Sequence, residues 1–174
     1  VKDAAVVGIP SKKYGEVAAA LIVLESGVQM TAEELKKRGG LYFEKIQEGW
    51  AACDWEQMYL SPRMARDFLV RLREENGPEN SFVDCYYPYL EEESKEKVRQ
   101  ALTAEEAAYL DALPAVKEEL IFPLDDMLLA IATKLNDREL LFFTFYFTRD
   151  PLTVWGNYKQ EYICFRPRKA GGVS

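Results

Sequence analysis

A run of eight residues near the C-terminal end, 140–147, constrains the fold more than any other stretch. Its sequence is Leu-Leu-Phe-Phe-Thr-Phe-Tyr-Phe, so only Thr144 interrupts the apolar side chains. Successive side chains of a strand point to opposite faces of a sheet, so a strand with this sequence is apolar on both faces. Left uncovered, it would promote aggregation. We therefore expect it to lie centrally in a sheet or to be covered on both sides.

Two further stretches carry strand signals. Residues 153–155 and 158–165 are β-prone, and the Gly-Asn pair between them favours a turn, so together they predict a hairpin. Residues 81–90 are rich in Phe, Val and Tyr but contain Pro88, which is typical of an edge strand or an irregular segment. The C-terminal half of the chain is thus expected to contribute most of a sheet.

Helix signals occupy the rest of the chain. Thr31 and Thr103 are each followed three residues later by Glu, which is the spacing of a capping box, and Ser61 precedes a proline at a helix start. A short helix is predicted to begin at residue 31, and a helix with a bend at Gly49 is predicted over 41–59. Four further helices are predicted, at 61–76, 91–99, 103–113 and 124–135. The predicted fold class is α+β: a short N-terminal strand pair and helix, then a helical part, then a hairpin-rich part.

Composition excludes several kinds of function. The net charge is −7, which opposes non-specific attraction to nucleic acid or to an anionic membrane surface. The chain has no histidine, which excludes Ser-His-Asp and Cys-His catalysis and histidine-ligated metal sites. Its three cysteines, Cys53, Cys85 and Cys164, lie far apart and predict reduced, inert thiols in a cytoplasmic protein. We expect no catalytic residue and no metal site.

Aromatic residues divide the chain unevenly. Residues 1–38 hold one of the 22 aromatic residues, Tyr14, and six basic against five acidic residues; the remainder holds 21 aromatics and has 16 basic against 24 acidic residues. The change falls near Gly39 and Gly40, which suit a helix end and also a junction. The predicted organisation is a segment 1–38, an acidic aromatic α+β module 41–166, and a flexible tail 167–174.

Residues 1–38 carry a family resemblance. The string Val1-Lys-Asp-Ala-Ala-Val-Val-Gly-Ile-Pro10, then Tyr14-Gly-Glu16, the apolar run 18–24 and Thr31-Ala-Glu-Glu-Leu35 follow one another in a recognisable order. This order resembles the C-terminal subdomain of AMP-forming acyl-CoA synthetases and related adenylate-forming ligases. The resemblance implies a strand, a turn, a second strand and a helix, the first part of the mobile lid that swings over the adenylation site.

The same resemblance limits what this chain is expected to do alone. In the family, the nucleotide pocket belongs to a large N-terminal domain, and the hinge precedes the matched strand. The catalytic lysine follows a Pro-[Lys/Arg]-x-x-x-Gly pattern; here Pro167-Arg-Lys-Ala-Gly-Gly172 is followed by Val173, so no family catalytic residue is assigned. ATP, Mg and coenzyme A are implied only for a full-length ligase, with an upstream adenylation domain as partner, and no cofactor is expected for this chain alone.

A second interpretation assigns function to residues 41–166 instead. An acidic, aromatic, histidine-free module suits a non-catalytic cytosolic protein that docks a basic partner, as immunity-type and antitoxin-type proteins do. Trp155, Asn157 and Tyr158 surround the predicted hairpin turn and are the candidate partner contacts, because Trp and Tyr contribute much of the energy of protein interfaces. Packing within the hairpin is the alternative use of the same side chains.

Overall fold

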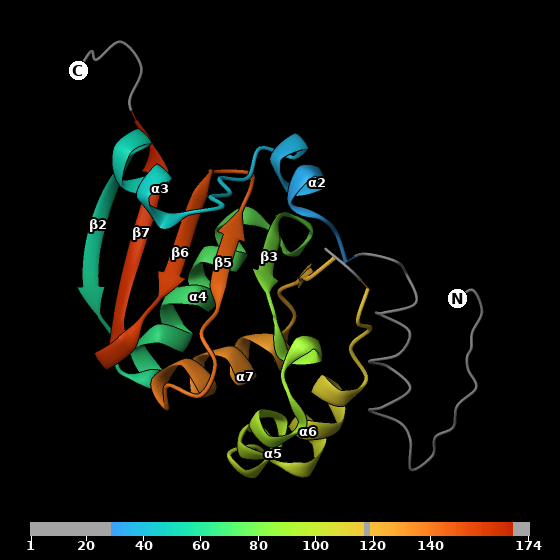
Figure 1. Ribbon diagram of the computed structural model, residues 1–174. Helices are drawn as coiled ribbons and strands as arrows, with labels where there is room; N and C mark the ends of the chain where they lie inside the picture. Colours follow the sequence, from blue (N-terminus) through green and yellow to red (C-terminus); the bar gives the residue numbers. More distant parts are fainter. Residues whose placement is uncertain (1–28, 117–118, 169–174) are drawn as a thin grey trace.

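The computed structural model of the protein describes residues 29–116 and 119–168 (Figure 1). Its centre is a six-stranded antiparallel sheet with the strand order β2-β7-β6-β5-β3-β4. The strands are β2 Cys53–Tyr59, β3 Ser81–Asp84, β4 Ile121–Pro123, β5 Thr144–Phe147, β6 Leu152–Gly156 and β7 Glu161–Pro167. The short N-terminal strand pair predicted within residues 1–24 lies outside the described residues, as does part of the predicted tail.

Helices cover the two faces of the sheet unequally. The longest, α4 and α7, lie together behind the strands in Figure 1, whereas α2 and α3 lie in front near one end. The α-helices are α2 Ala32–Lys37, α3 Ile46–Ala52, α4 Pro62–Asn76, α5 Glu92–Gln100, α6 Ala104–Asp111 and α7 Asp126–Asp137, with 3-10 turns η1 Pro78–Asn80, η2 Tyr87–Tyr89 and η3 Tyr158–Gln160. The arrangement confirms the predicted α+β class.

The β5 part of the run 140–147 is interior in the sheet, as predicted, and residues 145–147 are buried. Phe143, Phe145 and Phe147 are buried in the main core with the apolar sides of α4 and α7. Tyr146, on the opposite face, packs in a separate cluster with residues of α2 and β4. The strand is shorter than predicted and begins at Thr144, because the chain is still turning out of α7 at Leu140, whose N–H donates to Leu135 O.

Local capping chemistry sets most of the helix starts as predicted. Thr31 and Thr103 both form complete capping boxes, and the Ser61 side chain accepts a hydrogen bond from Met64 N. At the start of α7, the Asp125 side chain accepts from Leu128 N. These starts were predictable because each depends only on residues three positions apart.

Two predicted elements differ from the structure. Residues 41–59 do not form one bent helix: α3 ends at Ala52 and residues 53–59 form β2, which pairs with β7 over its whole length. Strand β2 lies at the edge of the sheet and most of its side chains are exposed on both faces. Its sequence therefore lacks the alternation of apolar and polar residues that indicates a strand. The prediction for 81–90, an edge strand or an irregular segment, is correct only in part. Residues 81–84 form β3, which is interior because it lies between β5 and β4, whereas residues 85–90 are irregular and hold Pro88 in η2.

The segment 29–43 packs against one face of the sheet and is joined to it by one isolated bridge. Met30 forms an isolated antiparallel bridge with Ile121, and Leu35 of α2 is fully buried against a cluster that includes Phe82. Gly39 has φ +99°, a left-handed conformation that favours glycine, and lets the chain turn back over the strands. Phe43 then packs edge-on against the ring of Phe165, with the centroids 5.3 Å apart.

This packing predicts that α2 belongs to the same cooperative unit as the sheet. Leu35→Ala should lower the free energy of unfolding by about 2–5 kcal/mol, because a fully buried leucine is lost and a cavity remains. Chemical denaturation measures the change, and Lys37→Ala, an exposed neighbour on the same helix, is the matched control. Equal unfolding free energies for the two variants would show that α2 is not part of that unit.

Candidate functional site

Two hollows open on the sheet face opposite α4 and α7. One has a volume of about 300 Å³ and the other about 330 Å³. They share four lining residues: Tyr42, Glu44, Asp84 and Tyr86. The first is also lined by Phe43, Ile46, Phe142, Thr144, Tyr146, Thr153 and Trp155, and the second by Thr31, Ala32, Glu33, Leu120 and Ile121. We call this pair of spaces the Asp84 hollow.

Asp84 is the central group of this site. It is the last residue of β3 and is only 7% exposed, on the same sheet face as Phe82 two residues earlier. Because β5 begins directly opposite, the backbone N–H of Thr144 donates to Asp84 Oδ1 at 2.9 Å. Burial raises the pKa of Asp84 from 3.8 to about 7, and hydrogen bonding by Thr144 and Tyr146 offsets this only in part. Such a carboxyl changes its charge near neutral pH.

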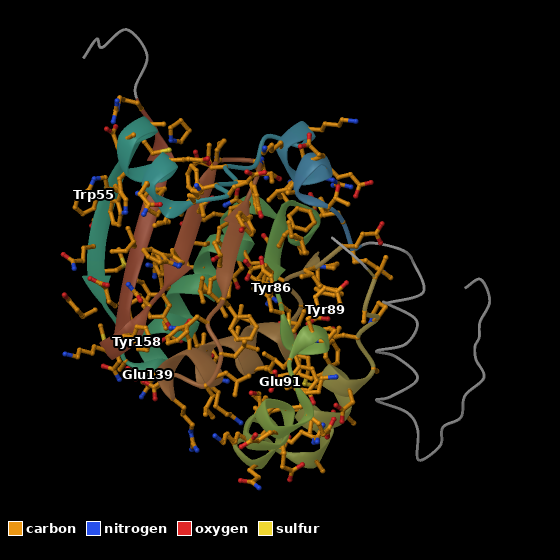
Figure 2. All side chains as sticks on the ribbon, viewed as in Figure 1. Trp55, Tyr86, Tyr89, Glu91, Glu139 and Tyr158 are labelled. Carbon is orange, nitrogen blue, oxygen red and sulfur yellow. The ribbon has the colours of Figure 1, made fainter. Side chains whose placement is uncertain are left out.

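Three tyrosines surround the carboxyl. The rings of Tyr42 and Tyr146 lie 6.1 Å apart, and Tyr86 is 43% exposed at the mouth of the hollow, where Figure 2 labels it beside β3. Burial, and then the negative charge of Asp84, raise the pKa of Tyr86 to about 12 and raise that of Tyr42 and Tyr146 as well. All three phenols therefore stay neutral at pH 7.

The described charged side chains that line the Asp84 hollow are all acidic. Within the described part of the chain, its lining includes three carboxyl groups, those of Asp84, Glu44 and Glu33, and neither lysine nor arginine. The nearest described cation–aromatic contact is that of Lys36, whose Nζ lies 5.7 Å from the centroid of the Tyr42 ring. The site therefore suits a positively charged or hydrogen-bond-donating ligand and disfavours an anion.

The cysteines do not supply a nucleophile here. Cys85 follows Asp84 but faces the main core, and burial raises its pKa to about 12. Burial also raises the pKa of Cys164 to about 12 and raises that of Cys53. All three are free and buried thiols. They remain protonated at neutral pH, as expected from the sequence.

The described residues lack both metal-ligand clusters and membrane-spanning helices. Residues 29–116 and 119–168 contain no group of three or more His, Cys, Asp or Glu side chains placed to hold a metal ion. In the same ranges, every helix is too short or too polar to cross a bilayer.

The structure separates the candidate partner contacts predicted at the hairpin turn. Trp155 is half-buried at the wall of the Asp84 hollow, 6.3 Å from the Trp50 ring centroid. Asn157 caps η3 and donates to the Glu161 side chain at 2.9 Å. Tyr158 is 60% exposed and packs on Phe142 with the centroids 4.6 Å apart. Only Tyr158 is freely available at the surface, and partner contact stays a prediction.

A larger hollow of about 640 Å³ lies between α4 and α7. Its walls bring Arg63 and Arg66 of α4 near Lys134 and Arg138 of α7, with Asp67, Glu106 and Asp137 among them. Lys134 is already paired with Glu106 at 2.7 Å. The mixed charges make this hollow a weaker candidate for a ligand site than the Asp84 hollow.

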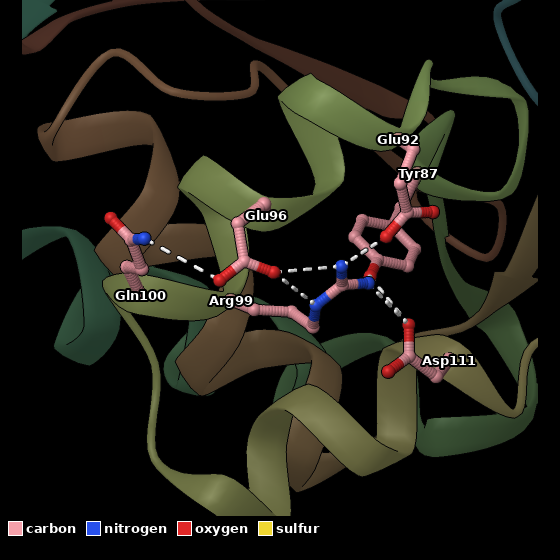
Figure 3. A network of polar contacts seen from close by, with 6 residues as sticks. All are labelled: Tyr87, Glu92, Glu96, Arg99, Gln100 and Asp111. Carbon is pink, nitrogen blue, oxygen red and sulfur yellow. Dashed lines mark hydrogen bonds and ion pairs between the residues drawn. The ribbon is translucent and has the colours of Figure 1, made fainter.

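A polar network at the far end of the molecule is structural (Figure 3). Arg99 of α5 donates to Glu92, to Glu96 at 2.9 Å and to Asp111 of α6 at 3.3 Å. The hydroxyl of Tyr87 accepts from Arg99 at 3.0 Å and donates to Asp111 at 2.5 Å. Because the guanidinium and its partners satisfy one another, the network fixes α5 against α6 and offers no vacant ligand group.

Sequence reasoning missed the Asp84 hollow. Its members come from residues 42–46, 84–86, 142–146 and 153–155, and only the sheet brings them together. One signal was present: Asp84 is the single charged residue within the stretch 82–87, which is otherwise Phe-Val-Cys-Tyr-Tyr. A lone acid in a buried strand is costly and therefore a candidate for function.

Comparison with known proteins identifies one related segment. The family model described as the AMP-binding enzyme C-terminal domain matches residues 1–46, about a quarter of the chain. The match confirms the family resemblance of residues 1–38 and extends it to the start of α3. No curated protein and no solved structure gives a significant match. The matched stretch includes Tyr42 and Glu44, so one wall of the Asp84 hollow belongs to it.

The buried carboxyl makes stability depend on pH. The pKa of Asp84 is about 7 in the folded protein, against an ordinary value of 3.8 that we take for the unfolded chain. Between about pH 4 and pH 7 the Asp84 carboxyl is therefore protonated in the folded state and mostly ionised in the unfolded state. The free energy of unfolding should fall by on the order of 3 to 4 kcal/mol as pH rises from 4 to 8. Asp84→Asn keeps an acceptor for Thr144 and should remove most of this slope, as measured by urea denaturation at several pH values.

Asp150→Asn is the matched control, because Asp150 is an exposed carboxyl outside the hollow. It should keep the wild-type slope. A slope between pH 5 and 8 that survives in Asp84→Asn would contradict the assignment of the titrating group.

Proposed function

We propose that this chain carries the lid segment of an AMP-forming acid–thiol ligase joined to a non-catalytic module, and that the 174 residues do not catalyse adenylation alone. The observation that carries the proposal is the family match over residues 1–46. On this view the parent protein uses ATP, Mg and coenzyme A in the cytoplasm, and an upstream adenylation domain supplies the nucleotide pocket.

The packing of the matched segment supports a mechanical role for the module. Met30, Leu35 and Tyr42 all lie within the match, and each contacts the sheet through β4, β3 or β5. A lid segment held in this way would move together with the sheet as one rigid body. The module would then extend the lid and restrict how it turns over an adenylation site.

ATP–pyrophosphate exchange tests the absence of activity in the isolated chain. The purified chain with Mg and a set of carboxylic acids should show no exchange above buffer, and isothermal titration with an acyl-adenylate analogue should show no heat. Exchange, or micromolar binding of the analogue, would contradict the proposal.

Reading the coding region upstream of the codon for Val1 should reveal an adenylation domain in phase, and a short leader with a start codon would contradict the ligase parent.

The exposed aromatic residues favour a second candidate function, the docking of a basic protein. Trp55 of the edge strand β2 is 51% exposed and packs edge-on against Trp50, with the ring centroids 4.6 Å apart. Tyr158, which is 60% exposed, lies on the same side of the molecule in Figure 2. Exposed aromatic anchors on a chain with a net charge of −7 suit a basic partner. This function needs no catalytic residue.

A pull-down with matched variants tests the second candidate. A captured basic protein should be lost with the Trp55→Ala/Tyr158→Ala double variant and at about 0.5 M salt, because screening weakens charge attraction. It should be retained with Tyr89→Ala, another exposed tyrosine. Capture that neither the double variant nor salt reduces would contradict docking through this surface.

A further inference from the structure

The Asp84 hollow combines two properties, an aromatic wall and carboxyl groups. Its larger wall is aromatic, formed by Tyr42, Phe43, Tyr86, Phe142, Tyr146 and Trp155. Its described charged groups are carboxyls: Asp84 and Glu44 line both spaces, and Glu33 lines one of them. In the described chain, neither space is lined by a lysine or arginine that would neutralise these carboxyls.

Aromatic faces and carboxylates attract the same kind of ligand. The face of an aromatic ring carries partial negative charge and binds cations, most strongly when water is excluded, and rings combined with acids recognise alkylated ammonium groups. The fold already shows one such contact, because Lys36 of α2 lies 5.7 Å from the centroid of the Tyr42 ring. Lys36 does not line the hollow, and neither does any other lysine or arginine of the described residues.

We propose that the Asp84 hollow binds an alkylammonium group, with the tyrosine and tryptophan rings as its cage and Asp84 as its principal counter-charge. The volume of about 300 Å³ is sufficient for a trimethylammonium group and a short chain. The group can belong to a free amine or to a lysine side chain of a partner. The proposal depends on neither the ligase relationship nor docking through Trp55 and Tyr158.

Proton release should accompany binding. The groups that line the hollow with Asp84 are the neutral hydroxyls of Tyr42, Tyr86, Tyr146 and nearby threonines and the carboxyls of Glu44 and Glu33, with no cation among the described residues. The empty site favours the protonated carboxyl because of burial, whereas a bound cation favours the carboxylate. Affinity should therefore rise between pH 6 and pH 8.

Choline and 3,3-dimethylbutan-1-ol provide a matched pair of probes, because they share one shape and differ in charge. Isothermal titration at pH 8 should show choline binding at least about tenfold more tightly than the neutral alcohol. Equal binding of the two probes would overturn the proposal, as would the failure of choline, up to about 10 mM, together with that of a trimethyllysine peptide.

Two variants locate the site. Tyr86→Ala removes a half-exposed wall and should weaken choline binding roughly threefold to thirtyfold, whereas Tyr89→Ala, an equally exposed tyrosine outside the hollow, should leave it unchanged. Asp84→Asn should abolish the rise in affinity between pH 6 and 8, with circular dichroism confirming that the variant is folded. Unchanged affinity in Tyr86→Ala, or a retained pH dependence in folded Asp84→Asn, would overturn the assignment.

A peptide carrying trimethyllysine separates the two sources of the ammonium group. If the peptide binds at least about tenfold more tightly than choline, the site serves a protein partner, and if choline binds as tightly, it serves a free amine. Both results support an alkylammonium site. Failure of both ligands contradicts it, without bearing on adenylation activity or on partner capture.

Discussion

The fold depends on covering strand β5 from both sides. Phe145 and Phe147 face α4 and α7, while Tyr146 faces the other way, so a two-layer arrangement of sheet and helices would leave an aromatic face in water. Residues 29–50 meet this requirement by crossing the second face with α2 and α3 (Figure 1). The same requirement explains why residues 29–46, the described part of the family match, pack against the sheet.

The second cover is incomplete, and the candidate site lies in the part left open. Between the chain at Tyr42 and the strands β3 and β5, the sheet face is hollow, and Asp84 lies at its base. Burying this carboxyl costs stability at neutral pH, a cost that an apolar residue at the same position would avoid. Native sequences keep such unfavourable groups mainly at functional sites. The position of Asp84 and the acidic, aromatic wall around it therefore support one interpretation, a site for a cation.

Sequence reasoning succeeded where structure depends on near neighbours and failed where it depends on the sheet. The starts of α2, α4 and α6 followed from Thr31, Ser61 and Thr103, because each cap involves residues three positions away. The edge strand β2 was missed because both its faces are exposed, and the interior position of β3 was missed because nothing local reveals its neighbours. The family resemblance was confirmed over residues 1–46, but it does not reach most of the hollow.

One titration tests the account most directly. Carbon-13 NMR of the chain labelled at its aspartate carboxyls would follow Asp84 through the pH range, with Asp84→Asn used to assign its signal. The structure predicts a midpoint near pH 7, because the carboxyl is buried beneath Tyr42 and Tyr146 and its hydrogen bond from Thr144 compensates only in part. A midpoint near the ordinary value of 3.8 would mean that water reaches the carboxyl freely. That result would show that residues 29–46 do not cover this face of the sheet. It would also contradict the existence of the Asp84 hollow and the proposed binding of an alkylammonium group in it.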